Sequence, residues 1–515
     1  MASMEGYRFE QETFVSDHEN FSWLQIILTF PNIVGMMLTT TTLGVLKKYI
    51  DRNVAVVVEF VLIVIPIILC YTILSEYIMS VCIVMMFIII LNIWLLKIKT
   101  VQLKLDVRPV TGKRPFITNF RALINIITAF CILAVDFRIF PRKFAKTEMY
   151  GYSLMDTGVG LFVLANALVA PEARDFSTSH KTGFQEVLMR YIKSFRSCIP
   201  LLILGFGRFI AVELTGYQKQ VTEYGVHWNF FLTLAFVKLF TGTITSTISP
   251  KYSLFLGVWI LGMHEYIMTT KDLCTWILGD APRDDFLSAN REGIISIPGY
   301  VGLYFIGVAI GRLIHSTYQN SNTRSNMKIS GKLCGFKFEA SYNESILLWI
   351  KISLISVLTS TAWISCRSYL KVSRRLANAG YCISMLILTI NLLYWLLYLE
   401  IVLDMINYAA SEPCNENKTK KLSKNSRLNL KKNVESERKE DTECVVKRSL
   451  EICDAVNYNG LFFFLLSNVL TGLVNLLMCT LYVKQLLAIL ILIIYMAISI
   501  FSTLILYRSQ IRVKL

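Results

Sequence analysis

Residues 136–160 read DFRIFPRKFAKTEMYGYSLMDTGVG and connect two apolar segments of the sequence. One apolar segment ends at Asp136, and the next begins near Leu154. A short connection between hydrophobic spans needs few charges, whereas a catalytic site at a membrane that acts on a charged lipid needs several. We therefore treat this stretch as a candidate site. Its charged residues between the two apolar segments are Arg138, Arg142, Lys143, Lys146 and Glu148.

The rest of the sequence consists largely of continuous apolar runs. Of its 515 residues, 54% are hydrophobic, and a membrane span needs about 20 apolar residues. Lipid-exposed backbone satisfies its hydrogen bonds only in helices or closed barrels, and runs that do not alternate favour helices. The predicted fold class is all-α, a polytopic membrane helical bundle of about 13 transmembrane helices. The predicted spans are 23–46, 53–73, 77–97, 118–136, 154–171, 199–215, 227–247, 252–268, 296–317, 345–366, 379–403, 458–481 and 485–506.

These spans divide the chain into four parts, and the third is polar, rich in lysine and poor in aromatic residues. Such a composition is typical of disorder, so we expect a loop without chemistry there. The four parts are a lumenal N-terminal tail (1–22), a bundle of about 11 helices (23–403) with a lumenal catalytic loop (136–153), a cytosolic loop (404–457), and the last two transmembrane helices with a cytosolic tail (458–515).

The distribution of Lys and Arg indicates the orientation. If the N-terminus is lumenal, the cytosolic segments hold 33 of these residues, with Lys97 at the edge of its span counted, and the lumenal segments hold 14. Positive charge concentrates on the cytosolic side of membrane proteins, so we expect a lumenal N-terminus and a cytosolic C-terminus. The lumenal segments 136–153 and 367–378 each carry four basic residues against this trend. Either this is local scatter, or these cations bind an anionic lipid headgroup, which is the interpretation we favour.

Several classes of function lack support in the sequence. The net charge of +16 comes without the interleaved aromatic and basic residues of a nucleic-acid surface, and loop Lys and Arg that set orientation account for it. The twelve cysteines are scattered and form no CxxC pair, and the histidines form no HExxH. We therefore expect no disulfide framework, no metal site and no bound cofactor.

Four further blocks of sequence accompany the stretch 136–160. They are EYGVHWNFFLTLAFV (223–237), NREGIISIPGY (290–300), SRRLANAGY (373–381) and FLLSNVLTGLVNL (464–476). Together with the first stretch, and in this order, they resemble the signature blocks of the GPI-anchor inositol acyltransferases, the PIG-W family. The N-terminal hundred residues and the loop 404–457 do not contribute to the resemblance.

The resemblance implies a multi-pass enzyme of the endoplasmic reticulum membrane. Such an acyltransferase moves a fatty acyl group, typically palmitoyl, from acyl-CoA to the inositol 2-hydroxyl of glucosaminyl-phosphatidylinositol in GPI-anchor biosynthesis. The two substrates are then the expected partners, with membrane lipid, and no nucleic acid or obligate protein partner is indicated. The alternatives are a polytopic lipid or metabolite transporter, which thirteen spans with charges inside them would suit, and a nonenzymatic assembly subunit. Paired broken helices in two similar halves, typical of transporters, are not visible.

Acyl transfer to a hydroxyl requires a base and a group that stabilises the oxyanion. Asp136 and Lys146 match the positions regarded as catalytic in the family. We assign Asp136 as the general base and expect Lys146 either to hold that carboxylate or to stabilise the oxyanion. Pro141 disfavours a continuous helix between them, so the chain can turn and bring the two together. The alternative is an ordinary interfacial ion pair.

Other polar residues of these blocks are candidates for substrate binding, and each also has a structural interpretation. Arg142 and Lys143 suit a lipid phosphate, and Asp156 either binds the headgroup or caps the helix that follows it. His227 is a rival for the base, although a binding role or interfacial anchoring is favoured. The full set of substrate-binding candidates is Arg142, Lys143, Glu148, Asp156, His227, Asn229, Arg291, Arg374, Arg375, Asn378, Asn468 and Asn475.

Two cations lie deep inside predicted spans. Arg208 and Lys238 are too far from the span ends to reach water easily, so each needs a partner or a polar cavity. We expect them to line the path of acyl-CoA, although pairing with acids on other helices accounts for them equally well.

Overall fold

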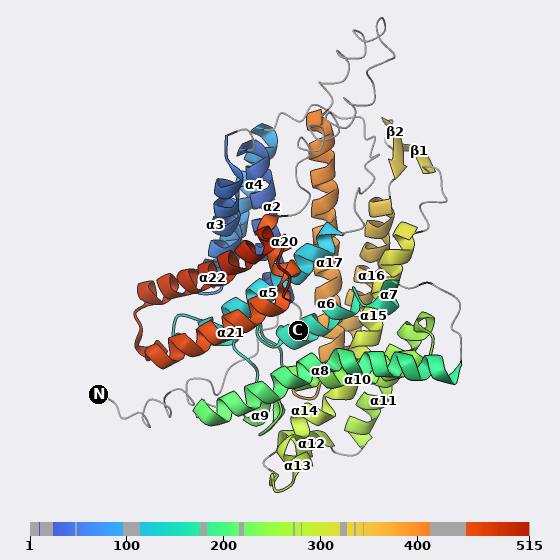
Figure 1. Ribbon diagram of the computed structural model, residues 1–515. Helices are drawn as coiled ribbons and strands as arrows, with labels where there is room; N and C mark the ends of the chain where they lie inside the picture. Colours follow the sequence, from blue (N-terminus) through green and yellow to red (C-terminus); the bar gives the residue numbers. More distant parts are fainter. Residues whose placement is uncertain are drawn as a thin grey trace, which may run out of the picture.

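The computed structural model is a bundle of helices with one two-stranded hairpin (Figure 1). It describes residues 10, 24–46, 49–95, 114–174, 176, 183–215, 221–270, 273–279, 281–319, 327–333, 336–342, 344–411 and 450–513. Apart from Glu10, the predicted N-terminal tail 1–22 lies outside the described residues. The hairpin pairs β1 (Met327–Leu333) with β2 (Phe336–Tyr342) in antiparallel register and leaves the predicted all-α class unchanged.

The helices fall into two groups by length. The long helices are α2 (Leu24–Leu46), α3 (Arg52–Cys70), α4 (Ile78–Leu95), α5 (Pro115–Ala134), α6 (Thr157–Ala167), α8 (Phe184–Thr215), α10 (Phe230–Thr247), α11 (Ser253–Thr270), α15 (Ile297–Gln319), α16 (Glu344–Cys366), α17 (Ala379–Ser411), α21 (Gly460–Leu477) and α22 (Gln485–Arg508). The short ones are α7 (Pro171–Arg174), α9 (Val221–Tyr224), α12 (Leu273–Leu278), α13 (Phe286–Ala289), α14 (Arg291–Ile295) and α20 (Glu451–Tyr458), with 3-10 turns η1 (Arg142–Phe144), η2 (Pro250–Tyr252) and η5 (Thr480–Tyr482).

Ten helices in the described part of the chain are long and apolar enough to cross a membrane. They coincide with ten of the thirteen predicted spans, so the multi-pass helical class is confirmed, while the count of about 13 is not. The predicted spans 23–46, 154–171 and 252–268 also form helices that fall short of the criterion. Of these, α6 has only 11 residues, because its first three predicted residues belong to a turn that holds Asp156.

The largest difference between a predicted and an observed helix start is in α8. The helix α8 begins at Phe184, fifteen residues before the predicted start of the span at 199. Its first part, 184–198, alternates charged with apolar residues at helical spacing, so a search for continuous apolar runs misses it. Figure 1 shows α8 and α10 side by side along their length.

Helix α5 lies inside the largest hydrophobic cluster of the described residues, packed against α17, α20 and α21. Pro115 at its first position suits a helix start, because proline lacks only a hydrogen bond that the first turn cannot make. Beyond its end the chain stays buried, since Phe137, Phe140 and Phe144 are completely covered. The Phe140 ring contacts those of Phe130 and Phe144. The apolar anchors therefore hold the charged loop after α5 against the bundle.

A buried charge cluster holds α20 at the other end of the bundle. Glu59 of α3 accepts hydrogen bonds from the backbone amides of Glu451 and Ile452, at 3.1 and 2.8 Å. This places a carboxylate at the start of α20, where unpaired amides favour negative charge. The Glu451 side chain forms ion pairs with Arg52 (2.7 Å) and Arg508 (3.1 Å). Helices α3, α20 and α22 are thus joined.

This packing shortens the predicted loop 404–457 at both ends. The helix α17 continues to Ser411, and α20 begins at Glu451. The amphipathic pattern of α20 is only two turns long and adjoins a lysine-rich stretch, which conceals it in the sequence. The remaining part of the predicted loop, 412–449, lies outside the described residues.

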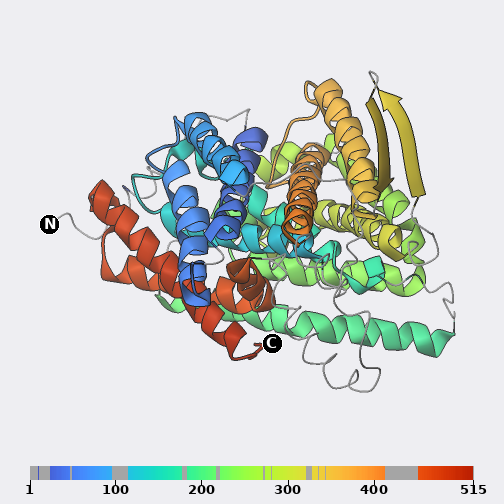
Figure 2. The ribbon, with the colours of Figure 1, turned by 90° about the horizontal axis from the view of Figure 1, so that it is seen from above.

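The two sides of the bundle are built differently. Figure 2 shows α2, α3 and α4 together on one side, next to α21 and α22, while α15, α16 and α17 stand together on the other. A second hydrophobic cluster joins α6, α10, α11 and α15 to the start of α17. The loops that follow α5 and α16 and those that precede α6, α10 and α15 meet at one end of this arrangement.

Candidate functional site

Asp156 is the most enclosed charge of this end of the bundle, with no exposed surface. One of its oxygens accepts hydrogen bonds from the amide and hydroxyl of Thr147 (3.1 and 2.8 Å) and from the amide and hydroxyl of Ser153 (3.0 and 2.9 Å). The carboxylate therefore organises the loop that precedes it. It makes no capping hydrogen bond to α6, so the capping interpretation is wrong.

Arg374 connects Asp156 to a second carboxylate. Its Nε donates to Asp156 Oδ1 at 2.7 Å, and its Nη1 lies 3.4 Å from Glu223 Oε1. The other oxygen of Glu223 accepts from Lys146 Nζ at 2.7 Å. Four residues from three separate segments thus form a chain of alternating charge, Lys146–Glu223–Arg374–Asp156, which we call the charge relay.

Electrostatics keeps the charge relay ionised. Burial alone would raise the pKa of Glu223, but the nearby Lys146 and Arg374 cations outweigh it and lower that pKa to about 2. Burial opposes the charge of Arg374, whose pKa is nevertheless raised because Glu223 and Asp156 surround it. Buried ions of this kind are stable only when each has a partner of opposite charge. The four charges balance, so the relay is complete as it stands.

The segment 373–378 presents Arg374 through a tight turn. The Asn378 side-chain oxygen accepts from the amides of Ser373 (3.0 Å) and Tyr381 (3.1 Å), so the same atom closes the turn and starts α17. Ala377 takes a left-handed backbone conformation (φ 45°), which costs energy for a residue other than glycine. Gly299 lies so close that a Cβ there would collide with the Ala377 carbonyl oxygen. These contacts fix the turn.

Arg375 points to a second buried carboxylate. Its Nη2 lies 3.0 Å from Glu292 Oε1, which also forms an ion pair with Arg283 at 2.5 Å. The other terminal nitrogen of Arg375 donates to the Glu148 carbonyl at 3.0 Å. Here too, desolvation opposes the cation and lowers the pKa of Arg375. The turn 373–378 is therefore attached both to the loop 136–156 and to α14.

Asp136 lies two residues beyond the end of α5 and accepts a hydrogen bond from Asn475 Nδ2 of α21 at 2.8 Å. Burial raises the pKa of Asp136 to about 6, although the Asn475 bond and the Arg142 and Lys146 cations act in the opposite direction. Arg142 donates to the carbonyls of Val135 and Phe137, at 2.9 and 3.0 Å, and so wraps around the Asp136 backbone. Asp136 is thus a partly buried carboxylate whose pKa lies above the ordinary range of an aspartate.

The expected contact between Asp136 and Lys146 is not formed. Among the described residues, no ion pair joins these two side chains, and the ammonium of Lys146 is bound to Glu223 instead. The chain does turn after Phe140, as Pro141 predicts. However, the turn η1 directs Arg142 toward Asp136, and Lys146 continues to the charge relay.

The remaining predicted residues are spread over several environments. Lys143 forms an ion pair with the exposed Glu76 at 2.5 Å, and the Glu148 side chain is exposed. His227 is exposed, stacks on Phe286, and receives support from Asn290, which accepts from its amide at 2.8 Å. The structure therefore places these three groups at the surface of the site.

Three predicted residues make contacts that hold the backbone. Asn229 caps α10 by accepting from the amides of Phe231 and Leu232, and it donates to the Gly205 carbonyl at 2.8 Å. Arg291 is almost completely buried and donates to the carbonyls of residues 277, 279 and 281. Asn468 donates to the Phe464 carbonyl of its own helix at 2.7 Å. These interactions position the elements around the site.

Sequence reasoning missed Glu223 and Glu292. Both belong to the blocks quoted above, yet a carboxylate in a loop gives no sign in the sequence of which cation it will meet. The four basic residues of 367–378 were the available signal, because cations gathered on the unexpected side of a membrane protein need carboxylates or anionic ligands. Arg374 and Arg375 meet Glu223 and Glu292 respectively.

A cavity of about 670 Å³ lies at the opposite ends of α5 and α6. Its lining, as far as the described residues form it, includes the cations Arg121, Lys238 and Arg512 and no Asp or Glu. Its apolar lining includes Phe162, Phe230, Phe231 and Phe464, which contact one another. Arg208 is exposed on α8 and does not line this cavity, so the structure separates it from Lys238.

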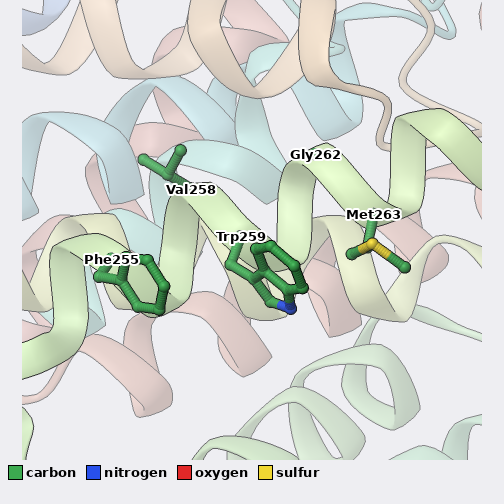
Figure 3. Close-up of a pocket in the computed structure, with 5 residues that line it drawn as sticks. All are labelled: Phe255, Val258, Trp259, Gly262 and Met263. Atoms are coloured by element: carbon green, nitrogen blue, oxygen red, sulfur yellow. The ribbon is translucent and has the colours of Figure 1, made fainter.

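A second hollow lies on the outer face of α11 (Figure 3). Phe255, Val258, Trp259 and Met263 project from the same helix, and no charged group lines the hollow. It therefore offers an apolar contact and no chemistry. Within the described residues, no group of three or more His, Cys, Asp or Glu side chains could hold a metal ion.

Comparison with known proteins gives a consistent result. A protein-family model described as GWT1 matches residues 7–506. Glucosaminyl-phosphatidylinositol-acyltransferase PIGW of Mus musculus is 31% identical over 460 residues, which cover 85% of this chain and 84% of the mouse protein. PIGW of Homo sapiens is 34% identical over 406 residues, or 78% and 74% of the two chains. GPI-anchored wall transfer protein 1 of Gibberella zeae is 36% identical over 400 residues, or 75% and 72%.

The charge relay predicts a difference in stability between two deletions of a cation. Arg374→Met leaves Asp156 and Glu223 buried without their shared partner, and we expect it to cost about 3 to 5 kcal/mol. Lys143→Met removes a cation whose partner Glu76 is exposed, and we expect at most about 1 kcal/mol. Thermal unfolding of the two purified variants in the same detergent measures the difference. Equal melting temperatures would contradict a structural role of the relay.

Proposed function

The chain belongs to the GWT1 family, and we propose that it is an acyltransferase of GPI-anchor biosynthesis. It moves a fatty acyl group, typically palmitoyl, from acyl-CoA to the inositol 2-hydroxyl of glucosaminyl-phosphatidylinositol. The observation that carries the proposal is the partly buried carboxylate of Asp136, which Asn475 holds and whose raised pKa suits a general base. Charged loops from segments far apart in the sequence surround it. The printed names of the relatives support the reaction class.

Asp136 acts as the base in the proposed reaction. Its carboxylate accepts the proton of the inositol hydroxyl while the oxygen attacks the thioester carbon, so that a C–O bond forms. The tetrahedral intermediate then collapses, the C–S bond breaks, and the thiolate of CoA leaves and takes up the proton held by Asp136. A base positioned in this way contributes about 10² to 10⁴-fold to the rate. Asn475 orients the carboxylate through its amide.

Lys146 supplies the positive charge for the oxyanion. The ammonium is about one third exposed, and the Glu223 bond holds it at the edge of the loop 136–156. A fixed cation next to the reacting carbon stabilises charge that develops on the thioester oxygen and needs no reorganisation during the reaction. Glu223 therefore serves as a positioning residue for Lys146.

The acceptor headgroup binds where loops 136–156, 221–229 and 367–378 meet. Glu148 and His227 are exposed there and can approach the glucosamine or the inositol hydroxyls. Arg142 and Lys143 provide cations for the lipid phosphate. Asp156, Arg374, Arg375 and Asn378 make extensive contacts with the protein, so their contribution is to hold these loops in place.

The acyl donor enters from the opposite end of the bundle through the cavity lined by Lys238. Cations at its lining suit the phosphates of CoA, and its aromatic lining suits the acyl chain. Arg121 and Asp136 are fifteen residues apart, or about 22 Å along a helix at 1.5 Å per residue. An extended acyl-pantetheine thioester has the reach for such a distance, so a cytosolic donor can serve a lumenal acceptor site.

The proposed location is the endoplasmic reticulum membrane, with many spans, a lumenal N-terminus and a cytosolic C-terminus. This orientation puts the loops around Asp136 on the lumenal side, and it puts the cavity lined by Lys238 on the side of cytosolic acyl-CoA. The counts of Lys and Arg support it.

The assignment of the base predicts a specific loss of turnover. Asp136→Asn keeps the shape and the contact with Asn475 but removes the base, so we expect kcat to fall at least about 10²-fold with a smaller change in acceptor KM. Purified protein with palmitoyl-CoA and glucosaminyl-phosphatidylinositol gives the measurement and also separates an enzyme from a transporter. Asp284→Asn, an exposed carboxylate near the same end, is the matched control. A fully active Asp136→Asn variant would transfer the role of base to His227.

The raised pKa of Asp136 predicts an acidic limit to activity. The base works only when ionised, so kcat should fall as the pH drops below about 6. The Asn475 hydrogen bond favours the ionised form, and Asn475→Ala should raise the pKa further and move this limb to higher pH. The pH dependence of kcat for both proteins decides the matter. If the acidic limb of the kcat profile does not shift in Asn475→Ala, then Asn475 does not act on the titrating group.

The orientation predicts which engineered cysteines react in sealed microsomes. Asn425→Cys, in the proposed cytosolic loop, should react with a membrane-impermeant maleimide. Tyr369→Cys, at an exposed position of 367–378, should react only after the membrane is permeabilised. The background needs Cys366 and Cys479, which are exposed, replaced by serine, together with Cys334, Cys414 and Cys444, which lie outside the described residues. The reverse labelling pattern would invert the proposed topology.

A further inference from the structure

The side chain of Asn459, directly after α20, binds the last described residues of the chain, 510–513, which we call the tail. Asn459 Nδ2 donates to the Ile511 carbonyl at 2.9 Å, and its Oδ1 accepts from the Val513 amide at 3.0 Å. The amide of Asn459 thus pairs with the backbone as a neighbouring strand would. Asn459 is only 2% exposed, so water competes little for these hydrogen bonds.

The conformation of the tail is also specified locally. After α22 ends at Arg508, Gln510 adopts a left-handed conformation (φ 56°), which turns the chain back toward α20. A residue with a Cβ pays conformational energy there, and such a conformation persists only when surrounding contacts impose it. The amide of Ile511 donates to the Leu506 carbonyl at 2.9 Å, which completes the turn.

Asn459 and the helix α20 before it are themselves held in place by neighbouring helices. Asn459 directly follows α20, whose first residues are held by Glu59 and whose Glu451 is paired with Arg52 and Arg508. Because Arg508 ends α22 and contacts α20, both partners of the Asn459 contact are fixed to the same buried charge cluster. The tail is therefore held as part of the folded bundle.

The fastened tail brings Arg512 to the cavity that Lys238 lines. Arg512 and Val513 belong to the lining, together with Asn457, Tyr458 and Asn459. The guanidinium lies 5.6 Å from the centre of the Tyr458 ring, which holds it over α20 without neutralising it. Among the described residues, no carboxylate pairs with Arg512.

The charged side chains in the described lining of the cavity are all positive. Arg121 donates to the Asn457 side chain at 2.8 Å, and Lys238 donates to the Ser197 carbonyl at 2.9 Å. Both cations thus have neutral partners, like Arg512, and the described lining contains no acid. Three cations without a neutralising carboxylate favour an anionic ligand, and the guanidinium provides paired donors that match phosphate oxygens.

We propose that the tail 510–513, fastened by Asn459, makes Arg512 a phosphate-binding residue for the nucleotide part of the acyl donor. The inference deepens the proposed function, on which it depends for the identity of the donor. Arg512 binds the anionic head, while the aromatic side of the cavity takes the acyl chain. Asn459 is a positioning residue, because it acts only through Arg512.

The experiment compares two donors that differ in charge. With palmitoyl-CoA, Arg512→Gln should raise the donor KM about tenfold and leave the acceptor KM unchanged, since a hydrogen bond to a charged group is lost. With S-palmitoyl-pantetheine, which lacks the phosphates, the same variant should match the wild type. A similar rise with both donors would overturn the proposal, because it would indicate general damage to the cavity. So would an unchanged KM for palmitoyl-CoA.

Further variants test the role of Asn459. Asn459→Ala releases the tail and should raise the KM for palmitoyl-CoA as Arg512→Gln does, and the double variant should be no worse than Arg512→Gln alone. Fully additive effects would contradict a shared action. Arg196→Gln is the control, since Arg196 is exposed on α8 next to the lining residue Ser197 but does not line the cavity.

A binding measurement separates this inference from the proposed reaction. Titration calorimetry with the nonhydrolysable palmitoyl-CoA thioether requires no turnover. If the wild type shows no acyl transfer but binds the thioether more tightly than Arg512→Gln does, the proposed reaction fails and the role of Arg512 stands. If the wild type and Arg512→Gln bind the thioether equally, or neither binds it, the role of Arg512 is refuted whatever the catalytic result.

Discussion

The buried ion pair between Arg374 and Asp156 is the constraint on which the candidate site depends. Neither charge can exist alone in an interior that excludes water, so each requires the other segment in place. Asp156 also satisfies the amides and hydroxyls of Thr147 and Ser153, and Arg374 also reaches Glu223. One interaction therefore fixes the loop after α5, the start of α6, the turn before α17 and the short helix α9 relative to one another.

The sequence predicted the features of this molecule that depend on composition and local pattern. Continuous apolar runs located ten of the spanning helices, and charge in unexpected loops drew attention to the segments 136–153 and 367–378, which the structure joins through Asp156, Arg374 and Arg375. Partners were not predictable, because the sequence contains no information on distances between loops. Lys146 was expected to meet Asp136, but it meets Glu223. Likewise, the helix α20 was assigned to a disordered loop, since its eight residues become buried only through contacts with α3, α5 and α22, which the sequence does not show.

The predicted ends of two helices were wrong for a related physical reason. Leu154 and Met155 are apolar and extend the predicted span, yet Asp156 accepts hydrogen bonds from the residues before it, and the helix starts only at Thr157. In α8 the predicted start is too late. Hydropathy alone starts the span at 199, but the amphipathic segment before it is also helical, and the helix begins at Phe184. In both places polar residues, and not the apolar run alone, mark where the helix begins.

In the reaction proposed above, the separation of Asp136 from Lys146 lets one loop provide two opposite charges. If the two were paired directly, the carboxylate would be neutralised by the cation that the oxyanion needs, and its pKa would be low. Glu223 removes that conflict by holding Lys146, while burial keeps the pKa of Asp136 near 6 and Arg142 offsets part of the cost of its charge. Groups whose environments set their protonation separately are typical of acid–base sites. The charge relay is thus the means by which the loop keeps a proton acceptor and a cation apart and both available.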